Sequence, residues 1–256
     1  MLLRKRAILW MILTFFVISG ATILFFGATI RTMQEDFYTR EAADLARTAA
    51  LCLDQERILR LREAVQEIYD QAEPRISNAE FEDPAYEDYL ARFSSLEENE
   101  DHLALVKRLR DIQAVNHVDC VYLLYMDVPT EALIYLADSE EEDPCLPGSF
   151  DRLDGDDYLT IRQPERGFGP TVSNTDAYGW VAGTGMPVFD DDGHVIAYVG
   201  VDVSMTEITA QRNRMLLNTA LSVLLMIIVL GAVSFYASGY FLKRRDQAET
   251  TPETAP

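Results

Sequence analysis

Two long runs of apolar residues without charge stand near the two ends of the 256-residue chain. The first runs from Ala7 to Ile30, 24 residues, and the second from Met215 to Leu242, 28 residues. A helix rises about 1.5 Å per residue, so each run can cross a bilayer core of roughly 30 Å. Basic residues precede the first run at positions 4–6 and follow the second at 243–245. Because basic flanks stay in the cytoplasm, the pattern predicts two transmembrane helices with both termini cytoplasmic.

The first apolar run has a second interpretation, as a cleaved secretory signal. Small residues at Gly27 and Ala28 resemble a cleavage site, but the apolar part of a signal is usually about 7 to 15 residues long. The length of the run therefore favours an uncleaved anchor, and either interpretation exports the middle of the chain. The predicted division is a cytoplasmic N-terminus (1–6), a membrane helix (7–30), an extracytoplasmic domain (31–214), a membrane helix (215–242) and a short, disordered cytoplasmic tail (243–256).

The exported segment begins with a helical pattern. From Thr32 to about Ala72 there is no Gly or Pro, and apolar residues recur at helical spacing. This predicts one long helix that ends before Pro74. About 40 residues would extend roughly 60 Å, much more than an average globular helix, which favours contact with a partner subunit and hence a homodimer.

The pattern then changes from helical to strand-like. The acidic stretch from Pro74 to Asp101 suggests short helices and a loop, and an amphipathic segment with apolar residues from Leu103 to Ile112 follows. Val118–Asp127 and Ala132–Asp138 are rich in Val, Leu and Tyr and predict two strands. Two further strands flank an Asp-Gly turn within Tyr178–Met205, a strong hairpin signal. No internal repeat is visible, and the sequence predicts a single α+β domain.

Charge and cysteine content exclude some classes of function. Setting aside the six basic and three acidic residues outside the apolar runs leaves 16 Lys and Arg against 39 Asp and Glu, a net charge of about −23. Such a charge repels nucleic acid and anionic lipid headgroups, so neither is expected as a partner. Cys52, Cys120 and Cys145 are too few and too widely spaced for a disulfide scaffold or a zinc site, and the sequence leaves open whether Cys120 and Cys145 are bridged.

The order of these elements resembles the Cache superfamily, and within it the PDC-type sensor domains. The specific part of the resemblance is carried by Tyr122–Pro147 and by the Tyr-Gly-Trp and Val-Gly-Val-Asp-Val-Ser-Met motifs of Tyr178–Met205. The resemblance implies a PAS-like antiparallel sheet with the long helix on one face and a small-molecule pocket on the other. Such domains are the input ends of bacterial chemoreceptors and sensor kinases, and their output domains follow the second span.

The C-terminal end departs from that family. Only 14 residues, Lys243 to Pro256, follow the second apolar run, and their last part, AETTPETAP, is typical of a disordered tail. This favours a complete short gene product that signals through a separate membrane or cytoplasmic partner. The alternative is a truncated receptor whose output domain is missing.

The last predicted strand provides the sharpest candidate for ligand binding. Side chains alternate between faces of a strand, so the row Val195, Ala197, Val199, Val201 and Val203 should pack on the long helix. Tyr198 and Asp202 would then face the open side, where a carboxylate needs a partner such as a ligand ammonium group. In amino-acid-binding Cache domains an Asp at the matching Gly-x-Asp position contacts the ligand amine. Asp202 could instead cap a turn or meet a protein cation.

Further candidates share an aromatic or acidic character near the same strands. Trp180 could form a wall of the pocket or belong to the core, and tyrosines could supply hydroxyls or pack. The family's Arg, Trp and Tyr set for a ligand carboxylate is not evident, which makes an amino acid a weaker candidate. The candidate ligands are an amino acid, an organic acid and an amine. The predicted ligand-binding residues are Asp202, Tyr198, Trp180, Tyr178, Tyr122, Tyr135 and Asp138.

No catalytic residues, metal ligands or cofactors are predicted. The acidic clusters do not have the spacing of an EF-hand loop, and surface solvation explains them better. The three histidines form no set with a nucleophile or a carboxylate. The leading hypothesis is a membrane-anchored sensor that moves its two membrane helices when a small molecule binds. The second is a structural or interaction protein that regulates a neighbouring membrane protein, which predicts a filled pocket with Asp202 paired to a cation.

Overall fold

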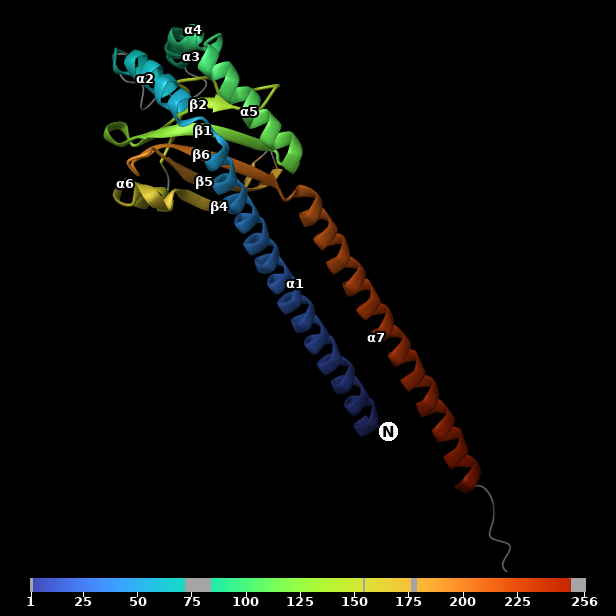
Figure 1. The fold of residues 1–256 in the computed structure, drawn as a ribbon. Helices are drawn as coiled ribbons and strands as arrows, with labels where there is room; N and C mark the ends of the chain where they lie inside the picture. Colours follow the sequence, from blue (N-terminus) through green and yellow to red (C-terminus); the bar gives the residue numbers. More distant parts are fainter. Residues whose placement is uncertain (1, 72–83, 154, 176–178, 250–256) are drawn as a thin grey trace, which may run out of the picture. The chain divides into compact units, whose positions relative to one another are not determined.

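The computed structural model describes residues 2–71, 84–153, 155–175 and 179–249 (Figure 1). The chain divides into two compact units. The first comprises residues 1–33 and 208–256, and the second comprises residues 34–207. Helix α1 (Leu2–Cys52) and helix α7 (Thr206–Glu249) contribute residues to both units.

The first unit consists of helix in its described part. Stretches within Leu13–Cys52 and Ile208–Ala237 are long and apolar enough to cross a membrane, judged by length and composition. Hydroxyl groups within these stretches are satisfied locally: Thr22 donates to the carbonyl of Ile18 at 2.8 Å, and Thr219 donates to that of Met215 at the same distance. Such bonds remove the cost of placing a hydroxyl in an apolar environment.

The expectation of one helix from Thr32 to Ala72 is wrong. Helix α1 ends at Cys52, and a separate helix α2 spans Gln55–Gln71. The side chain of Asp54 accepts hydrogen bonds from the backbone N–H groups of Glu56 and Arg57, at 3.1 and 3.2 Å. An aspartate in this position satisfies the free donors at the start of a helix, so it favours a new helix over continuation of the old one. The length argument for a homodimer is correspondingly weaker.

The second unit contains a six-stranded antiparallel sheet in the order β3-β2-β1-β6-β5-β4. The predicted strands are confirmed as β1 (Cys120–Asp127), β2 (Ala132–Asp138), β5 (Gly179–Phe189) and β6 (Val195–Ser204). The Asp-Gly turn joins β5 to β6, and Asp190 closes it. Two edge strands were not predicted from the sequence, β3 (Phe150–Arg152) and β4 (Phe168–Thr175). The architecture is therefore α+β, as predicted.

Helices cover one face of this sheet (Figure 1). They are α2, the C-terminal part of α1 and α5 (Glu100–Asn116), which begins at the N-cap Asn99. Arg57 and Arg60 of α2 both pair with Asp101 of α5, at 2.9 and 2.8 Å. The short helix α3 (Pro84–Leu90) adds Tyr86 and Tyr89 to this side, and α4 (Ser94–Glu97) adds Leu96. The predicted end of the helix at Pro74 lies outside the described residues.

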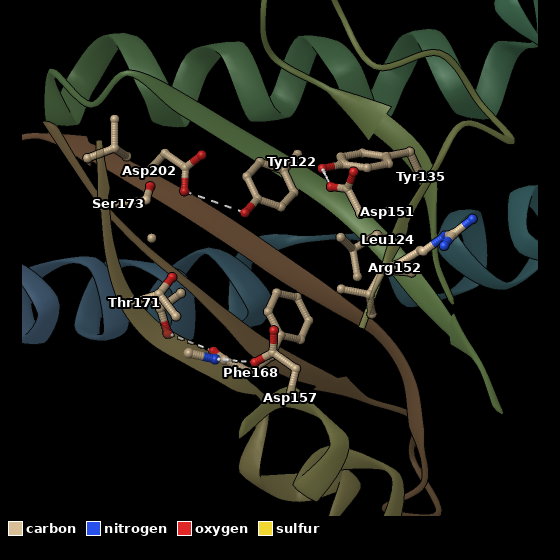
Figure 2. Close-up of a pocket in the computed structure, with 15 residues that line it drawn as sticks. Tyr122, Leu124, Tyr135, Asp151, Arg152, Asp157, Phe168, Thr171, Ser173 and Asp202 are labelled. Atoms are coloured by element: carbon tan, nitrogen blue, oxygen red, sulfur yellow. Dashed lines mark hydrogen bonds between the residues drawn. The ribbon is translucent and has the colours of Figure 1, made fainter. Parts of the chain in front are cut away.

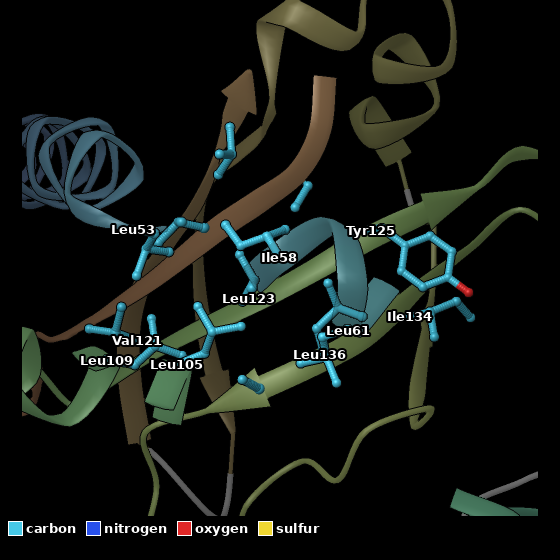
Figure 3. Packing of buried hydrophobic residues seen from close by; sticks show 14 of the residues in the cluster. Leu53, Ile58, Leu61, Leu105, Leu109, Val121, Leu123, Tyr125, Ile134 and Leu136 are labelled. Atoms are coloured by element: carbon cyan, nitrogen blue, oxygen red, sulfur yellow. The ribbon is translucent and has the colours of Figure 1, made fainter. Parts of the chain in front are cut away.

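The main hydrophobic core lies between these helices and the sheet. Alternate residues of β1 and β2 point into it, and Figure 3 shows them interleaved with Leu and Ile side chains of α2 and α5. Burial of this apolar surface is the principal stabilising term of the unit. The alternation leaves the other residues of each strand on the opposite face of the sheet. Those residues include Tyr122, Leu124, Leu133 and Tyr135.

The sheet face predicted for each side chain of β6 is correct from Ala197 onward. Ala197, Val199, Val201 and Val203 belong to the main core, and Tyr198 belongs to the opposite face. Val195 and Ile196 are exchanged relative to the prediction, since Ile196 lies in the main core and Val195 packs on the other side. The register explains this: Val188 pairs with Ala197 and Phe189 with Val195, so Ile196 is an extra residue. A bulge of this kind reverses the alternation locally.

Candidate ligand-binding site

A cavity of about 320 Å³ lies on the sheet face opposite the helices (Figure 2). Strands β1 to β6 all contribute to its wall, and the short helical turn Gly155–Asp157 closes part of it. The lining mixes aromatic rings, aliphatic groups, hydroxyls and carboxylates. The lining residues are Tyr122, Leu124, Leu133, Tyr135, Asp151, Arg152, Asp157, Phe168, Gly169, Thr171, Ser173, Val181, Gly183, Thr184 and Asp202.

Three glycines make room for the side chains of this cavity. A Cβ on Gly200 would collide with the ring of Tyr122, and a Cβ on Gly185 would collide with the ring of Phe168. A Cβ on Gly183 would lie 2.6 Å from the carboxylate of Asp202. A sheet face used only for packing would gain stability from larger side chains at these positions. The glycines instead let two rings and a carboxylate lie directly over the strand backbones.

Asp202 occupies the part of β6 that faces the cavity. Burial, together with the nearby carboxylates of Asp119, Asp138 and Asp151, raises the pKa of its carboxyl to about 7. The hydroxyl of Tyr122 opposes this effect but donates only a long hydrogen bond of 3.5 Å. Within the described part of the chain, no Lys, Arg or His forms an ion pair with Asp202. Its negative charge is therefore only weakly compensated by the protein.

Two other carboxylates line the cavity from different elements. Asp151 on β3 accepts a hydrogen bond from the hydroxyl of Tyr135 at 2.7 Å. Burial raises the pKa of Asp151, and that hydrogen bond acts in the opposite direction. Asp157 accepts a hydrogen bond from the backbone N–H of Gly169 at 3.0 Å. Asp202 and Asp157 lie on opposite sides of the cavity, with Thr171 and Phe168 nearby (Figure 2).

The structure brings together three of the seven residues selected from the sequence. Asp202, Tyr122 and Tyr135 line the cavity, and the rings of the two tyrosines are 5.6 Å apart. Tyr198 lies on the same face but packs against Phe168, with ring centroids 5.3 Å apart. Burial raises the pKa of Tyr198 to about 12.

The remaining candidates lie elsewhere. Trp180 is half-buried on β5, next to the lining residue Val181, and its backbone N–H bonds to the hydroxyl of Thr206 at 3.2 Å. Asp138 is buried at the end of β2, outside the lining residues. Tyr178 lies outside the described residues.

Asp138 organises the end of β2 and the loop after it. Its carboxylate accepts a hydrogen bond from the Cys120 thiol at 2.9 Å, and others from the backbone N–H groups of Glu140 and Cys145, at 3.0 and 2.9 Å. Three hydrogen-bond donors satisfy the acceptor oxygens of this buried carboxylate, so Asp138 has a structural role. The three cysteines are free thiols in the structure. Burial raises the pKa of Cys145 to about 12 and that of Cys120 well above its ordinary value.

Two groups of described residues bring their ligand atoms close enough to surround one metal ion. They are Cys120 with Asp138 and Glu140, and Asp190 with Asp192 and His194. The first group is held by the hydrogen bonds just described. In the second, Asp190 accepts hydrogen bonds from the backbone N–H groups of Asp192 and His194 and so stabilises the β5–β6 turn. Both arrangements have an explanation in the fold of their loops.

Sequence reasoning missed most of the wall contributed by residues 151–173. Asp151 and Asp157 stand in an acidic segment interpreted as solvated surface, and Phe168 and Thr171 belong to the missed strand β4. The alternation of β5 offered one usable signal, since Gly183 and Gly185 share a face of the strand. Two glycines on one face of a strand indicate a close approach by other groups.

No protein-family model matches the chain, and no curated protein matches it. Among solved structures, the ligand-binding domain of the Campylobacter jejuni chemoreceptor Tlp3, in complex with 4-methylisoleucine, is 16% identical. That match covers 66% of this chain and 59% of Tlp3 at a TM-score of 0.30. A second structure of the Tlp3 sensory domain is 15% identical over 70% and 64% of the chains, at a TM-score of 0.27.

A GAF domain from an Acinetobacter phosphoenolpyruvate-protein phosphotransferase is 12% identical over 59% and 99% of the chains, at a TM-score of 0.28. The chain spans about three fifths of the length of the Tlp3 domains it matches. Similarities of this size do not assign the chain to a family.

Proposed function

We propose that the chain is a membrane-anchored sensor with an extracytoplasmic domain of the Cache type, which binds a small molecule in the cavity beside Asp202. Occupancy of the cavity would be transmitted through α1 and α7 to a separate partner or to an output domain. Both termini would lie in the cytoplasm. The large apolar side chains exposed along both helices support the anchoring, because lipid would cover them.

The observation that carries the proposal is the cavity itself. Its volume of about 320 Å³ lies in the range of small-molecule sites, and its lining combines apolar surface with a few polar groups. A carboxylate with little compensation faces it, and three glycines keep its floor open. An interaction protein without a ligand would be expected to fill this space and to pair Asp202 with a cation.

The position of Asp202 suggests how a ligand would act on the membrane helix. Asp202 is four residues from Thr206, where α7 begins, and its backbone pairs with Cys120 on β1. Met205 lies between β6 and α7, and its backbone N–H donates a hydrogen bond to the carbonyl of Trp180 at 2.7 Å. This bond holds the end of the strand against β5. A ligand that binds one arrangement of this strand end more tightly than another would shift the equilibrium between the two.

Thermal unfolding of the full-length chain in detergent micelles tests the proposal. Amines, amino acids and organic acids at millimolar concentration are added singly, and a ligand of the cavity raises the midpoint of unfolding. Ser173→Trp places a large ring at the mouth of the cavity, and Asn174→Trp places the same ring on the other side of β4. We expect the shift to persist in Asn174→Trp and to disappear in Ser173→Trp.

Two outcomes would contradict the proposal. If no compound of the three classes stabilises the wild-type chain, the cavity does not bind these compounds. That result would favour the hypothesis of an interaction protein without a ligand. If a compound stabilises both tryptophan variants equally, it binds elsewhere.

A further inference from the structure

The charges of the cavity define the ligand more closely, provided that the proposed function is correct. We infer that the cavity selects a linear dication, an aliphatic diamine that places one ammonium group at Asp202 and the other at Asp157. This goes beyond the sequence, which left amino acids, organic acids and amines all as candidate ligands.

The lining carries an excess of negative charge. Three carboxylates, Asp151, Asp157 and Asp202, stand against a single cationic residue, Arg152, among the described residues of the wall. Arg152 is exposed, and its guanidinium points away from the cavity in Figure 2. The formal excess of two negative charges equals the charge of a diamine. Anionic ligands would meet repulsion there, and the carboxylate of an amino acid would find no inward-facing cation among the described lining residues.

The spacing of the carboxylates distinguishes an extended cation from a metal ion. A single ion needs ligand oxygens that converge on one point. Within the described chain, the groups of three or more ligand residues that converge within 4.8 Å include none of Asp151, Asp157 and Asp202. Two separate charges on a flexible chain fit carboxylates that lie on opposite sides of a cavity (Figure 2).

Asp202 and Asp157 each keep an oxygen available. One oxygen of Asp202 takes the long bond from Tyr122, and one oxygen of Asp157 takes the N–H of Gly169. An ammonium group has three donors and forms strong, charge-assisted hydrogen bonds with carboxylate oxygens. Asp151 already accepts a short bond from Tyr135, so it adds negative charge to the field and is less available for direct contact.

The apolar part of the lining suits methylene groups. Leu124, Leu133, Phe168 and Val181 line the cavity, and the ring of Tyr122 lies beside Asp202. Apolar wall of this kind favours an alkyl chain, and an aromatic face adds attraction for a nearby ammonium group. The wall thus combines two carboxylates on opposite sides of the cavity with apolar surface that an alkyl chain can contact.

Isothermal titration calorimetry on the full-length chain in detergent tests this inference at pH 7.5. The probes are the α,ω-diaminoalkanes from three to eight carbons, the 1-aminoalkanes of equal carbon number, butanedioate, leucine and calcium chloride. We expect at least one diamine to bind at least tenfold more tightly than its matched monoamine. Asp202→Asn and Asp157→Asn should each weaken that diamine tenfold or more, and Asp143→Asn, which removes an exposed carboxylate elsewhere, should leave it unchanged.

The comparison of each diamine with its monoamine uses only the wild-type chain, so the test remains valid even if a variant does not fold. Equal affinity for the diamine and its monoamine would overturn the second ammonium contact. Binding of leucine, butanedioate or calcium without diamine binding would overturn the inference. If leucine or butanedioate binds, the proposed function as a small-molecule sensor is still supported. If none of these probes binds, and the broader thermal screen is also negative, the inference and the proposed function fail together.

Discussion

Replacement of Asp202 by asparagine is expected to stabilise the ligand-free protein at alkaline pH. The carboxyl of Asp202 has a pKa of about 7 in the folded chain, against an ordinary value of 3.8. The folded state therefore holds a proton that the unfolded state has already released between these two values. Unfolding then becomes easier as the pH rises from about 4 to about 7, and the cost is complete above pH 7. Asparagine keeps the size of the side chain and removes the charge.

The size of this stability change follows from the difference between the folded and unfolded pKa values of Asp202. They differ by about three pH units, and each unit corresponds to about 1.4 kcal/mol. The full cost of the ionised carboxylate is thus about 4 kcal/mol, and water entering the open cavity reduces it. We expect Asp202→Asn to raise the free energy of unfolding by about 2 to 4 kcal/mol at pH 8 and by about 1 kcal/mol or less at pH 4.5.

Urea unfolding of the full-length chain in detergent, followed by tryptophan fluorescence between pH 4.5 and 8.5, measures this difference. Asp143→Asn serves as the control, because its carboxylate is exposed. Tyr122→Phe removes the one hydrogen bond that lowers the pKa of Asp202, so it should destabilise the chain more at pH 8 than at pH 4.5. A stability gain in Asp202→Asn that is the same at both pH values, or a loss at pH 8, would refute the reasoning.

Two further predictions concern the floor of the cavity and the thiols. Gly200→Val should lower the free energy of unfolding by about 2 to 3 kcal/mol in the same urea assay, because its side chain collides with the ring of Tyr122; an unchanged midpoint would show that the ring moves freely. A membrane-impermeant maleimide should label the exposed Cys52 in intact cells and leave Cys120 and Cys145 unmodified until the protein is unfolded, since burial raises the pKa of both. Labelling of Cys52 only after permeabilisation would reverse the proposed topology.

Regular alternation made the central strands predictable. The residues of β1 and β2 alternate between the main core and the opposite face, and an Asp-Gly pair marks the turn between β5 and β6. Local patterns of this kind are sufficient because each strand is specified by its own side chains. The same alternation directed Asp202 and Tyr122 to the face that carries the cavity.

Features that depend on partners distant in sequence were not predictable in the same way. Strand β4, with the sequence FGPTVSNT, contains Gly and Pro and shows no alternation, and it is a strand because β5 pairs with it. The bulge at Ile196 likewise depends on the register with β5. Asp157 resembles any solvated acid in the sequence. The turn Gly155–Asp157 brings it to the cavity, where it accepts a hydrogen bond from the backbone N–H of Gly169.

The break between α1 and α2 illustrates a local signal that was overlooked. Apolar residues continue at helical spacing across Asp54, which favours a single helix. The carboxylate of Asp54 nevertheless caps the N–H groups of Glu56 and Arg57. Aspartate favours helix starts over helix interiors, so the residue type itself carried the information.

Proton exchange on ligand binding shows whether an ammonium group binds beside Asp202. At pH 7 about half of the Asp202 carboxyls carry a proton, because the pKa is about 7. An ammonium group bound beside Asp202 favours the ionised form, so binding should release about 0.3 to 0.5 proton per site. Calorimetry with the best-binding diamine, in two buffers of different ionisation enthalpy, measures this number. We expect release in the wild-type chain and none in Asp202→Asn. Proton uptake, or equal release in both chains, would show that the ligand does not place an ammonium group at Asp202.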